Sequence, residues 1–218
     1  VVVSEDICLV MSTLLNPGEE VLIPDPAYLA YPACVSIAHG VPVLVPTYAK
    51  DEFRLTVEEL EKKVTPKTKA ILIGYPNNPT GTIMDRASLE KVAAFAKAHD
   101  LIVIADEIYC DLTYEGQHTC FASLPDMQER TIVLNGFSKS YAMTGLRIGY
   151  VCAPREALEE IYKVHQYEIL CASTTSQYGA IEALRNCDDD VKAMFEEYAA
   201  RREMIYEGLV DIGLTVFK

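Results

Sequence analysis

The feature of this sequence that most constrains its fold is a regular alternation of short apolar runs with longer amphipathic stretches. The apolar runs predict strands at residues 20–24, 41–46, 69–74, 101–105, 131–135 and 147–153. The stretches between them predict helices at residues 4–15, 28–38, 56–64 and 85–99, and residues 154–218 have a helical pattern that includes 188–212. Strands that alternate with helices favour a mostly parallel sheet covered on both faces, so we expect an α/β fold with three layers, α/β/α.

Local signals mark two of the helix starts and one buried strand. Ser4 is expected to cap the first helix, and Thr56 with Glu59 has the spacing of a capping box. The run 101–105 is apolar at every position, which is typical of a strand that is buried on both faces.

Composition excludes several classes of function. The chain of 218 residues has 19 basic and 32 acidic residues, a formal net charge of −13, and no cluster of Lys and Arg. Such a chain is not expected to bind nucleic acid or an anionic membrane surface. No apolar run is long enough to predict a membrane span, and the first residues lack the basic segment of a signal or transit peptide.

Cysteine and histidine usage points away from metal sites and disulfides. The seven cysteines form no Cys-x-x-Cys pair, and the four histidines are scattered along the chain. We therefore expect no metal site, and we expect buried, reduced thiols in a cytoplasmic protein.

Three predicted strand ends carry polar clusters, and ligands of such sheets bind beyond the carboxyl ends of the strands. The first cluster, residues 75–81 (YPNNPTG), is either a rigid loop that aims an amide side chain or an ordinary proline-rich turn. The second holds Asp106 and Tyr109, and its alternative is a solvated acidic strand end. The third holds Lys139 and Arg147, and its alternative is a surface lysine in a serine-rich turn.

The third cluster suits a ligand with a carbonyl and a phosphate. A lysine that is desolvated or near other cations can attack a carbonyl and form a Schiff base, which is the role expected of Lys139. Hydroxyl and guanidinium groups suit a phosphate dianion, which is the role expected of Ser138 and Arg147.

The other two clusters complete the same ligand. An ionised Asp106 would keep a basic ring nitrogen protonated, and Asn78 and Tyr109 would bind a phenolic oxygen. Pyridoxal 5′-phosphate has a carbonyl, a phosphate, a ring nitrogen and a phenolic oxygen, so it is the predicted cofactor.

The segments YPNNPTG, ADEIY and NGFSKSYAMTGLRIGY resemble, in this order, the class I/II aminotransferases of the fold type I pyridoxal-phosphate family, in particular the aspartate/aromatic type. The resemblance covers nearly the whole chain. It implies that residues 1–218 are the pyridoxal-phosphate-binding large domain, incomplete at its N-terminus and without the C-terminal small domain, toward which residues 188–218 lead. Because that small domain supplies the arginine that binds the substrate carboxylate, we expect a cofactor core without a complete substrate site, which could leave this chain inactive alone.

The resemblance also implies roles for individual residues. Lys139 would form the Schiff base and then move a proton between substrate and cofactor. Asp106 would pair with the ring nitrogen, and Tyr109 and Asn78 would bind the phenolate oxygen. Lys139, Asp106 and Tyr109 are thus the expected catalytic residues.

The remaining expected contacts surround the ring and the phosphate. Tyr28 would stack on the ring, and Ser138, Arg147 and Ser4 would bind the phosphate. This chain departs from the family pattern in two places on the phosphate side. Residues 2–3 are valines where a glycine-rich loop is usual, and Gly136 stands where some members have a serine.

The implied reaction is the transfer of an amino group between an amino acid and a 2-oxo acid through the Lys139 Schiff base. The implied assembly of the full-length protein is a homodimer, with Gln166, Tyr167 and residues 173–177 near the partner. Two classes of alternative remain open: another chemistry on the same fold, such as a C–S β-lyase or a decarboxylating condensation, and a non-catalytic sensor domain of a transcription regulator. The sequence does not identify the amino donor or acceptor.

Overall fold

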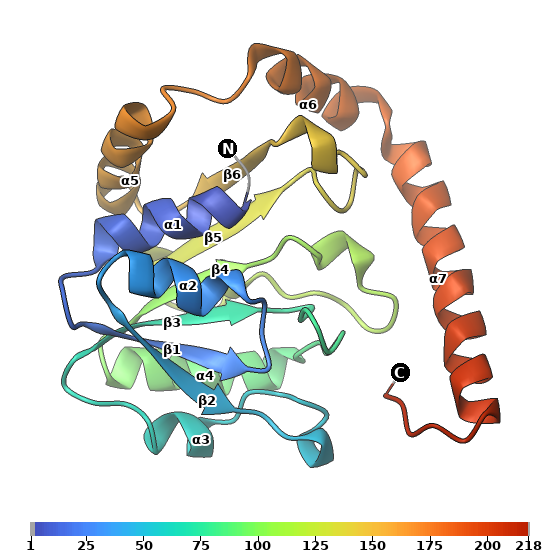
Figure 1. Ribbon diagram of the computed structural model, residues 1–218, viewed down its shortest axis with the longest axis horizontal. Coiled ribbons are helices and arrows are strands. Elements are labelled where there is room, and N and C mark those ends of the chain that lie inside the picture. The colour runs from blue at the N-terminus through green and yellow to red at the C-terminus, as the bar shows by residue number, and fades with distance from the viewer. Residues whose placement is uncertain (1–2, 218) are drawn as a thin grey trace.

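The computed structural model describes residues 3–217, and its centre is one six-stranded sheet (Figure 1). The strands are β1 (Glu20–Asp25), β2 (Val41–Pro46), β3 (Thr68–Gly74), β4 (Ile102–Asp106), β5 (Thr131–Gly136) and β6 (Gly149–Cys152). Their order is β2-β1-β3-β4-β5-β6, with β1 to β5 parallel and β6 antiparallel to β5. The carboxyl ends of β3, β4 and β5 therefore lie side by side at one edge of the sheet.

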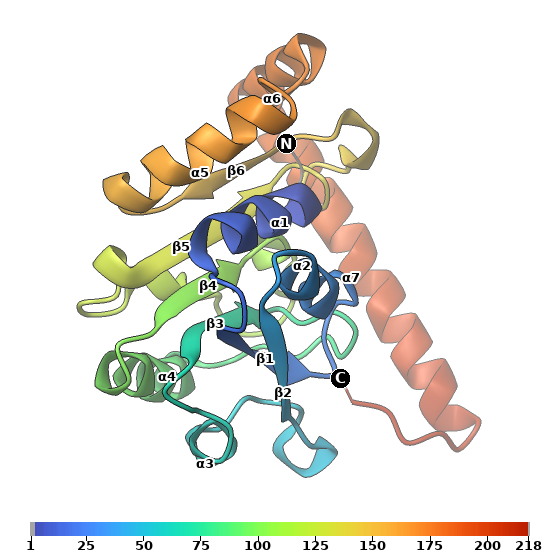
Figure 2. The same ribbon diagram turned by 60° about the vertical axis from the view of Figure 1, so that its left-hand side comes forward.

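Helices cover both faces of this sheet and form the two outer layers (Figures 1 and 2). The helices of the described chain are α1 (Val3–Leu14), α2 (Ala30–Ile37), α3 (Val57–Glu61), α4 (Arg86–Ala98), α5 (Arg155–Glu168), α6 (Thr174–Asn186) and α7 (Asp188–Asp211), of which the first five cover the sheet. One face packs against α3 and α4, and the other packs against α1, α2 and α5. The expected three-layer α/β/α fold is confirmed.

Alternation of side chains along β3 shows how one strand serves both layers. Ile71 and Ile73 point into the core that contains α4, whereas Ala70 and Leu72 point into the core that contains α1 and α2. All four are at most 4% exposed, which explains the apolar run with no polar face.

The two expected caps are not formed as predicted. Ser4 lies inside the first turn of α1, which begins at Val3 in the described chain. Thr56 is the N-cap residue of α3 but its side chain makes no capping hydrogen bond. Glu59, the other member of the expected box, places Oε1 2.6 Å from Lys62 Nζ, and this ion pair draws its carboxylate away from the cap.

Two of the C-terminal helices are anchored to the sheet layer by a few small or apolar side chains. In α5, Ile161 joins the core beneath α1. In α6, Ala180 and Ala183 pack against Phe137 and Ile148.

Helix α7 is held differently, because none of its described residues is buried. It runs along the outside of the molecule in both views (Figures 1 and 2). Arg202 Nη1 lies 3.0 Å from Glu115 Oε1, and the ring centroids of Phe195 and Tyr114 are 5.1 Å apart. Within residues 3–217, none of the helices combines the length and apolar character that crossing a bilayer requires.

Candidate functional site

A cavity of about 210 Å³ opens at the carboxyl ends of β3, β4 and β5. Every side chain that the sequence predicts for the site lines this cavity: Ser4, Tyr28, Asn78, Asp106, Tyr109, Ser138, Lys139 and Arg147. These residues come from α1, from the segment before α2, and from the ends of three neighbouring strands. The structure thus brings together side chains that are up to 143 positions apart (147 − 4 = 143).

Asp106 ends β4 and is 5% exposed, so the alternative of a solvated acidic strand end is wrong. Its Oδ1 accepts a hydrogen bond of 3.1 Å from the Ile108 N–H, and its Oδ2 accepts one of 2.8 Å from the Tyr31 hydroxyl. Burial raises the pKa of Asp106 to about 6, against the two hydrogen bonds, which lower it. The two donors therefore fix the orientation of the carboxyl group and favour its ionised form.

Tyr31 is a polar residue of the cavity that sequence reasoning missed. It is buried, lines the cavity, and packs its ring edge-on against Tyr28 with centroids 5.6 Å apart. The available signal was the requirement that a buried carboxylate meets a donor, because Asp106 needed a partner and Tyr31 is one residue that could supply a hydroxyl.

The neighbouring acidic residue, Glu107, has a structural role. It is 6% exposed, and its Oε1 accepts a hydrogen bond of 2.9 Å from the Phe121 N–H. Its Oε2 lies 3.0 Å from His118 Nε2. Glu107 thus ties the loop after β4 to the sheet, while Asp106 faces the cavity.

The two asparagines in the loop after β3 have different surroundings. Asn77 is buried, and its Oδ1 accepts hydrogen bonds from both the N–H and the hydroxyl of Thr80, at 3.2 and 2.9 Å. Asn77 therefore stabilises the turn. Asn78 is exposed and lines the cavity, as the sequence-based assignment of the ligand-facing amide requires.

Lys139 follows β5 and places Nζ 5.4 Å from the centroid of the Tyr109 ring. Its positive charge lowers the pKa of Asp106, which places the two groups within electrostatic reach of each other. Lys139 is half-buried and lines the cavity, so it is not simply a surface lysine in a turn.

The side of the cavity expected to bind phosphate contains one unsatisfied hydroxyl. Ser138 is 6% exposed, and its Oγ has no hydrogen-bond partner among the described residues. Arg147 is exposed, has φ = 51°, and donates a hydrogen bond of 2.7 Å from Nη1 to the Thr144 carbonyl. Ser4 and Val3 bring the start of α1 to the same cavity, whereas Val2, the other valine of the expected loop, lies outside the described residues.

Gly136 is required by the pairing of β5 with β6. A Cβ at this position would come within 2.7 Å of the Gly149 Cα and 3.0 Å of the Ile148 carbonyl oxygen. A serine, as in some members of the resembled family, would push these two strands apart.

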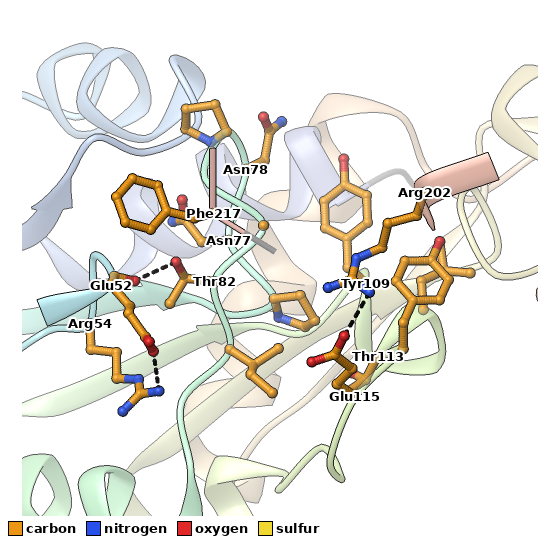
Figure 3. A pocket seen from close by; sticks show the side chains of 16 residues that line it. Glu52, Arg54, Asn77, Asn78, Thr82, Tyr109, Thr113, Glu115, Arg202 and Phe217 are labelled. Atoms are coloured by element: carbon orange, nitrogen blue, oxygen red, sulfur yellow. Dashed lines mark hydrogen bonds and ion pairs between the residues drawn. The ribbon is translucent and has the colours of Figure 1, made fainter. Parts of the chain in front are cut away.

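A second, larger cavity of about 780 Å³ adjoins the first and shares Pro76, Asn78 and Tyr109 with it (Figure 3). Figure 3 shows Phe217 and Asn77 on one side of this cavity and Arg202 with Glu115 on the other. This larger cavity lies between the sheet edge and α7, beside the cavity that the predicted site residues line.

The thiols only partly follow the expectation of burial. All seven cysteines are free, and Cys34 is buried, with its Sγ 2.7 Å from that of Cys8. Cys152 and Cys171 are exposed, so the prediction is wrong for them. Cys152 lies on edge strand β6, where alternate side chains face outward. No group of three or more potential metal ligands occurs in residues 3–217.

The sheet order and the side chains at its carboxyl edge define a three-layer α/β domain of the fold type I aminotransferase class. The family description "Aminotransferase class I and II" matches residues 4–218. The chain therefore belongs to the class I and II aminotransferase family.

Individual relatives agree with this assignment. The chain is 47% identical over 212 residues to the putative aminotransferase YugH of Bacillus subtilis, covering 97% of this chain and 55% of the relative. It is 44% identical to aromatic-amino-acid aminotransferase 2 of Thermococcus litoralis, covering 99% and 56%. The crystal structure of an aromatic aminotransferase from Pyrococcus horikoshii superimposes with a TM-score of 0.95 at 45% identity, covering 98% and 58%. The chain thus spans little more than half the length of these proteins.

Proposed function

We propose that this chain is the cofactor-binding large domain of a pyridoxal-phosphate-dependent aminotransferase that moves an amino group between an amino acid and a 2-oxo acid. The observation that carries the proposal is the convergence of Lys139, Asp106 and the unpartnered Ser138 hydroxyl in one cavity. Family membership supports the reaction class.

The residues of the cavity fit pyridoxal phosphate at each of its ends. The buried Ser138 Oγ, left without a partner, is a donor available to a phosphate oxygen. Arg147 and the start of α1 at Ser4 line the same cavity, and they would add positive charge and N–H donors. At the opposite end, Asp106 would hold the ring nitrogen, and Tyr28 lies beside the cavity as a stacking surface.

When bound, pyridoxal phosphate supplies an electron sink for negative charge that develops at the substrate Cα. Lys139 Nζ would hold the aldehyde carbon until the substrate amine takes its place there, and the freed Lys139 amine would then carry the proton to and from that Cα. Asp106 would keep the ring nitrogen protonated, and Tyr109 with Asn78 would bind the phenolic oxygen. The rigid sheet edge fixes these groups before the ligand arrives.

The proposed setting is a homodimer in the cytoplasm. Tyr167, one of the residues expected near a partner, is 91% exposed, and Leu170 beside it is 76% exposed. Exposed apolar side chains of this kind support an additional contact surface. Seven free cysteines support a reducing compartment.

The test is a titration of the 218-residue chain with pyridoxal phosphate, followed by visible absorbance, borohydride reduction and peptide mapping. We expect a new visible band and, after reduction, a pyridoxyl group on the peptide that contains Lys139. Lys139→Ala should abolish both, whereas Lys192→Ala, an exposed lysine on α7, should retain both. Label spread over many lysines, equally strong in Lys139→Ala, would contradict the proposal.

A further inference from the structure

Tyr31 is a buried side chain at the proposed cofactor site for which neither the motifs nor the reaction supplies a role. It is 5% exposed, and its hydroxyl oxygen lies 2.8 Å from Asp106 Oδ2. Burial, and then the nearby Asp106, raise the pKa of Tyr31 well above its usual range. The hydroxyl therefore remains protonated and is the donor of this hydrogen bond.

Asp106 is fixed by two donors of different origin. The Ile108 N–H reaches Oδ1 from the same loop, while the Tyr31 hydroxyl reaches Oδ2 from α2, 75 residues away in the chain. Only the second donor is a side chain that mutation can remove. Each carboxylate oxygen still has a free lone pair, so the carboxylate can accept a further hydrogen bond from a ligand.

Gly74 leaves the space that the Tyr31 hydroxyl occupies. A Cβ built on Gly74 would overlap the Tyr31 hydroxyl oxygen and come within 3.3 Å of its Cζ. Gly74 is the last residue of β3 and pairs in register with Asp106 on β4. Any other residue at this position would displace the hydroxyl from the carboxylate.

We propose that Tyr31 is a positioning residue that holds the Asp106 carboxylate in one orientation for the ring nitrogen of the cofactor. In this arrangement residue 74 is a glycine because the Tyr31 hydroxyl occupies the space where a Cβ would lie. The inference deepens the proposed function and rests on it for the identity of the ligand. The contact between Tyr31, Asp106 and Gly74 itself does not depend on the ligand.

The charged groups around Asp106 set the direction of the expected effects. Burial raises the pKa of this carboxyl, with a smaller contribution from Glu107, and Lys139 and the Tyr31 hydroxyl lower it. Asp6 of α1 also interacts electrostatically with Asp106. Removal of the Tyr31 hydroxyl leaves the other groups in place, so the pKa of Asp106 should rise.

The first test measures the carboxyl directly in the cofactor-free protein. We expect Tyr31→Phe to raise the titration midpoint of Asp106, followed by carboxyl carbon NMR, by about one unit, which is a tenfold change in its acid dissociation constant. Tyr162→Phe, a half-exposed tyrosine on α5, should leave the midpoint unchanged. An unchanged midpoint in Tyr31→Phe would overturn the proposal.

The second test measures affinity for pyridoxal phosphate. Tyr31→Phe should bind about tenfold more weakly, with a larger loss at pH 6.5 than at pH 8.5, because more of Asp106 is then protonated. In an Asp106→Asn background the same substitution should cost almost nothing. A loss of equal size in both backgrounds would show that Tyr31 acts only through packing, which contradicts the proposal.

The third test introduces a steric clash at Gly74 and then relieves it by removing the Tyr31 hydroxyl. Gly74→Ala should lower the melting temperature and raise the Asp106 midpoint, because its methyl group displaces the hydroxyl. Combining it with Tyr31→Phe removes the overlapping oxygen, so the double variant should melt higher than Gly74→Ala alone. If the double variant melts no higher, Gly74 is not reserved for this hydroxyl.

The two proposals fail in distinguishable ways. If wild-type protein gives no Lys139-linked band with pyridoxal phosphate, the proposed function fails, while the NMR midpoint still reports the Tyr31–Asp106 contact. If the band forms on Lys139 but Tyr31→Phe changes neither the midpoint nor the affinity, the proposed function stands and the role of Tyr31 is refuted.

Discussion

The sheet layers and the C-terminal helices of this chain are built in opposite ways. Helix α4, 13 residues long, buries five of them against the sheet, whereas α7, 24 residues long, has no buried residue among those described. Every predicted site residue lies between Ser4 and Arg147, and none lies on α5, α6 or α7. The site is thus placed where two-sided burial fixes the backbone, and the outer helices contribute little to its geometry.

The largest difference between the two regions is expected when one leucine in each is replaced by alanine. Leu72 of β3 is fully buried, and Leu72→Ala should lower the free energy of unfolding by about 2–5 kcal/mol through lost burial and a cavity. Leu184 of α6 is 59% exposed, and Leu184→Ala should change it by about 0.5 kcal/mol or less. Urea denaturation followed by circular dichroism measures both. Equal losses would mean that α6 is as firmly packed as the sheet.

Replacing one glycine in each region by alanine should change the stability of the chain in opposite directions. At Gly136, an added Cβ would collide with the backbone of β6, so Gly136→Ala should destabilise the chain by about 1–3 kcal/mol. At Gly208 of α7 nothing lies within 4 Å of the added Cβ, and Gly208→Ala should stabilise the helix by about 0.5–1 kcal/mol.

Thermal unfolding and helical circular dichroism read out the glycine pair. If Gly208→Ala is also destabilising, α7 packs more closely than its exposure indicates. This result would contradict the stated difference in packing between the two regions. If Gly136→Ala is neutral, strand β6 can move away from β5 at little cost.

The sequence predicted the sheet well because local pattern and burial coincide there. The run predicted at 41–46 is β2, and Asp85, expected to begin the next long helix, caps α4 by accepting the Ser88 N–H. The last predicted strand began at residue 147, but Arg147 has φ = 51° and belongs to the turn, so β6 begins at Gly149. The hydrophobic pattern of a sequence does not reveal that an arginine adopts the left-handed backbone conformation.

The sequence predicted which residues line the cavity more completely than it predicted the hydrogen bonds between them. The three strand-end clusters and the family resemblance named eight residues that the fold gathers in one cavity. Tyr31 was missed because its partner lies 75 residues away and its own surroundings look like an ordinary amphipathic helix start. A contact of that range depends on β3 and β4 lying side by side, which periodicity alone does not specify.

The last prediction compares a buried aspartate of the sheet layers with an exposed aspartate of α7. Asp6 of α1 is 2% exposed, and its Oδ2 has no hydrogen-bond partner among residues 3–217. Burial raises the pKa of Asp6 from 3.8 to about 7, so between about pH 4 and pH 7 the folded state binds a proton that the unfolded state lacks. The free energy of unfolding should therefore fall as the pH rises through this range and level off above it.

Asp6→Asn removes this titration. Between pH 5 and pH 7.5, wild type should lose about 1–2 kcal/mol more stability than Asp6→Asn does. Asp106, with its pKa raised to about 6, contributes in the same direction and remains in the variant. Asp189→Asn, an exposed position in the first turn of α7, should keep the wild-type pH dependence because Asp6 is intact. Parallel wild-type and Asp6→Asn curves from urea denaturation at each pH would show that Asp6 gains a partner or water in solution.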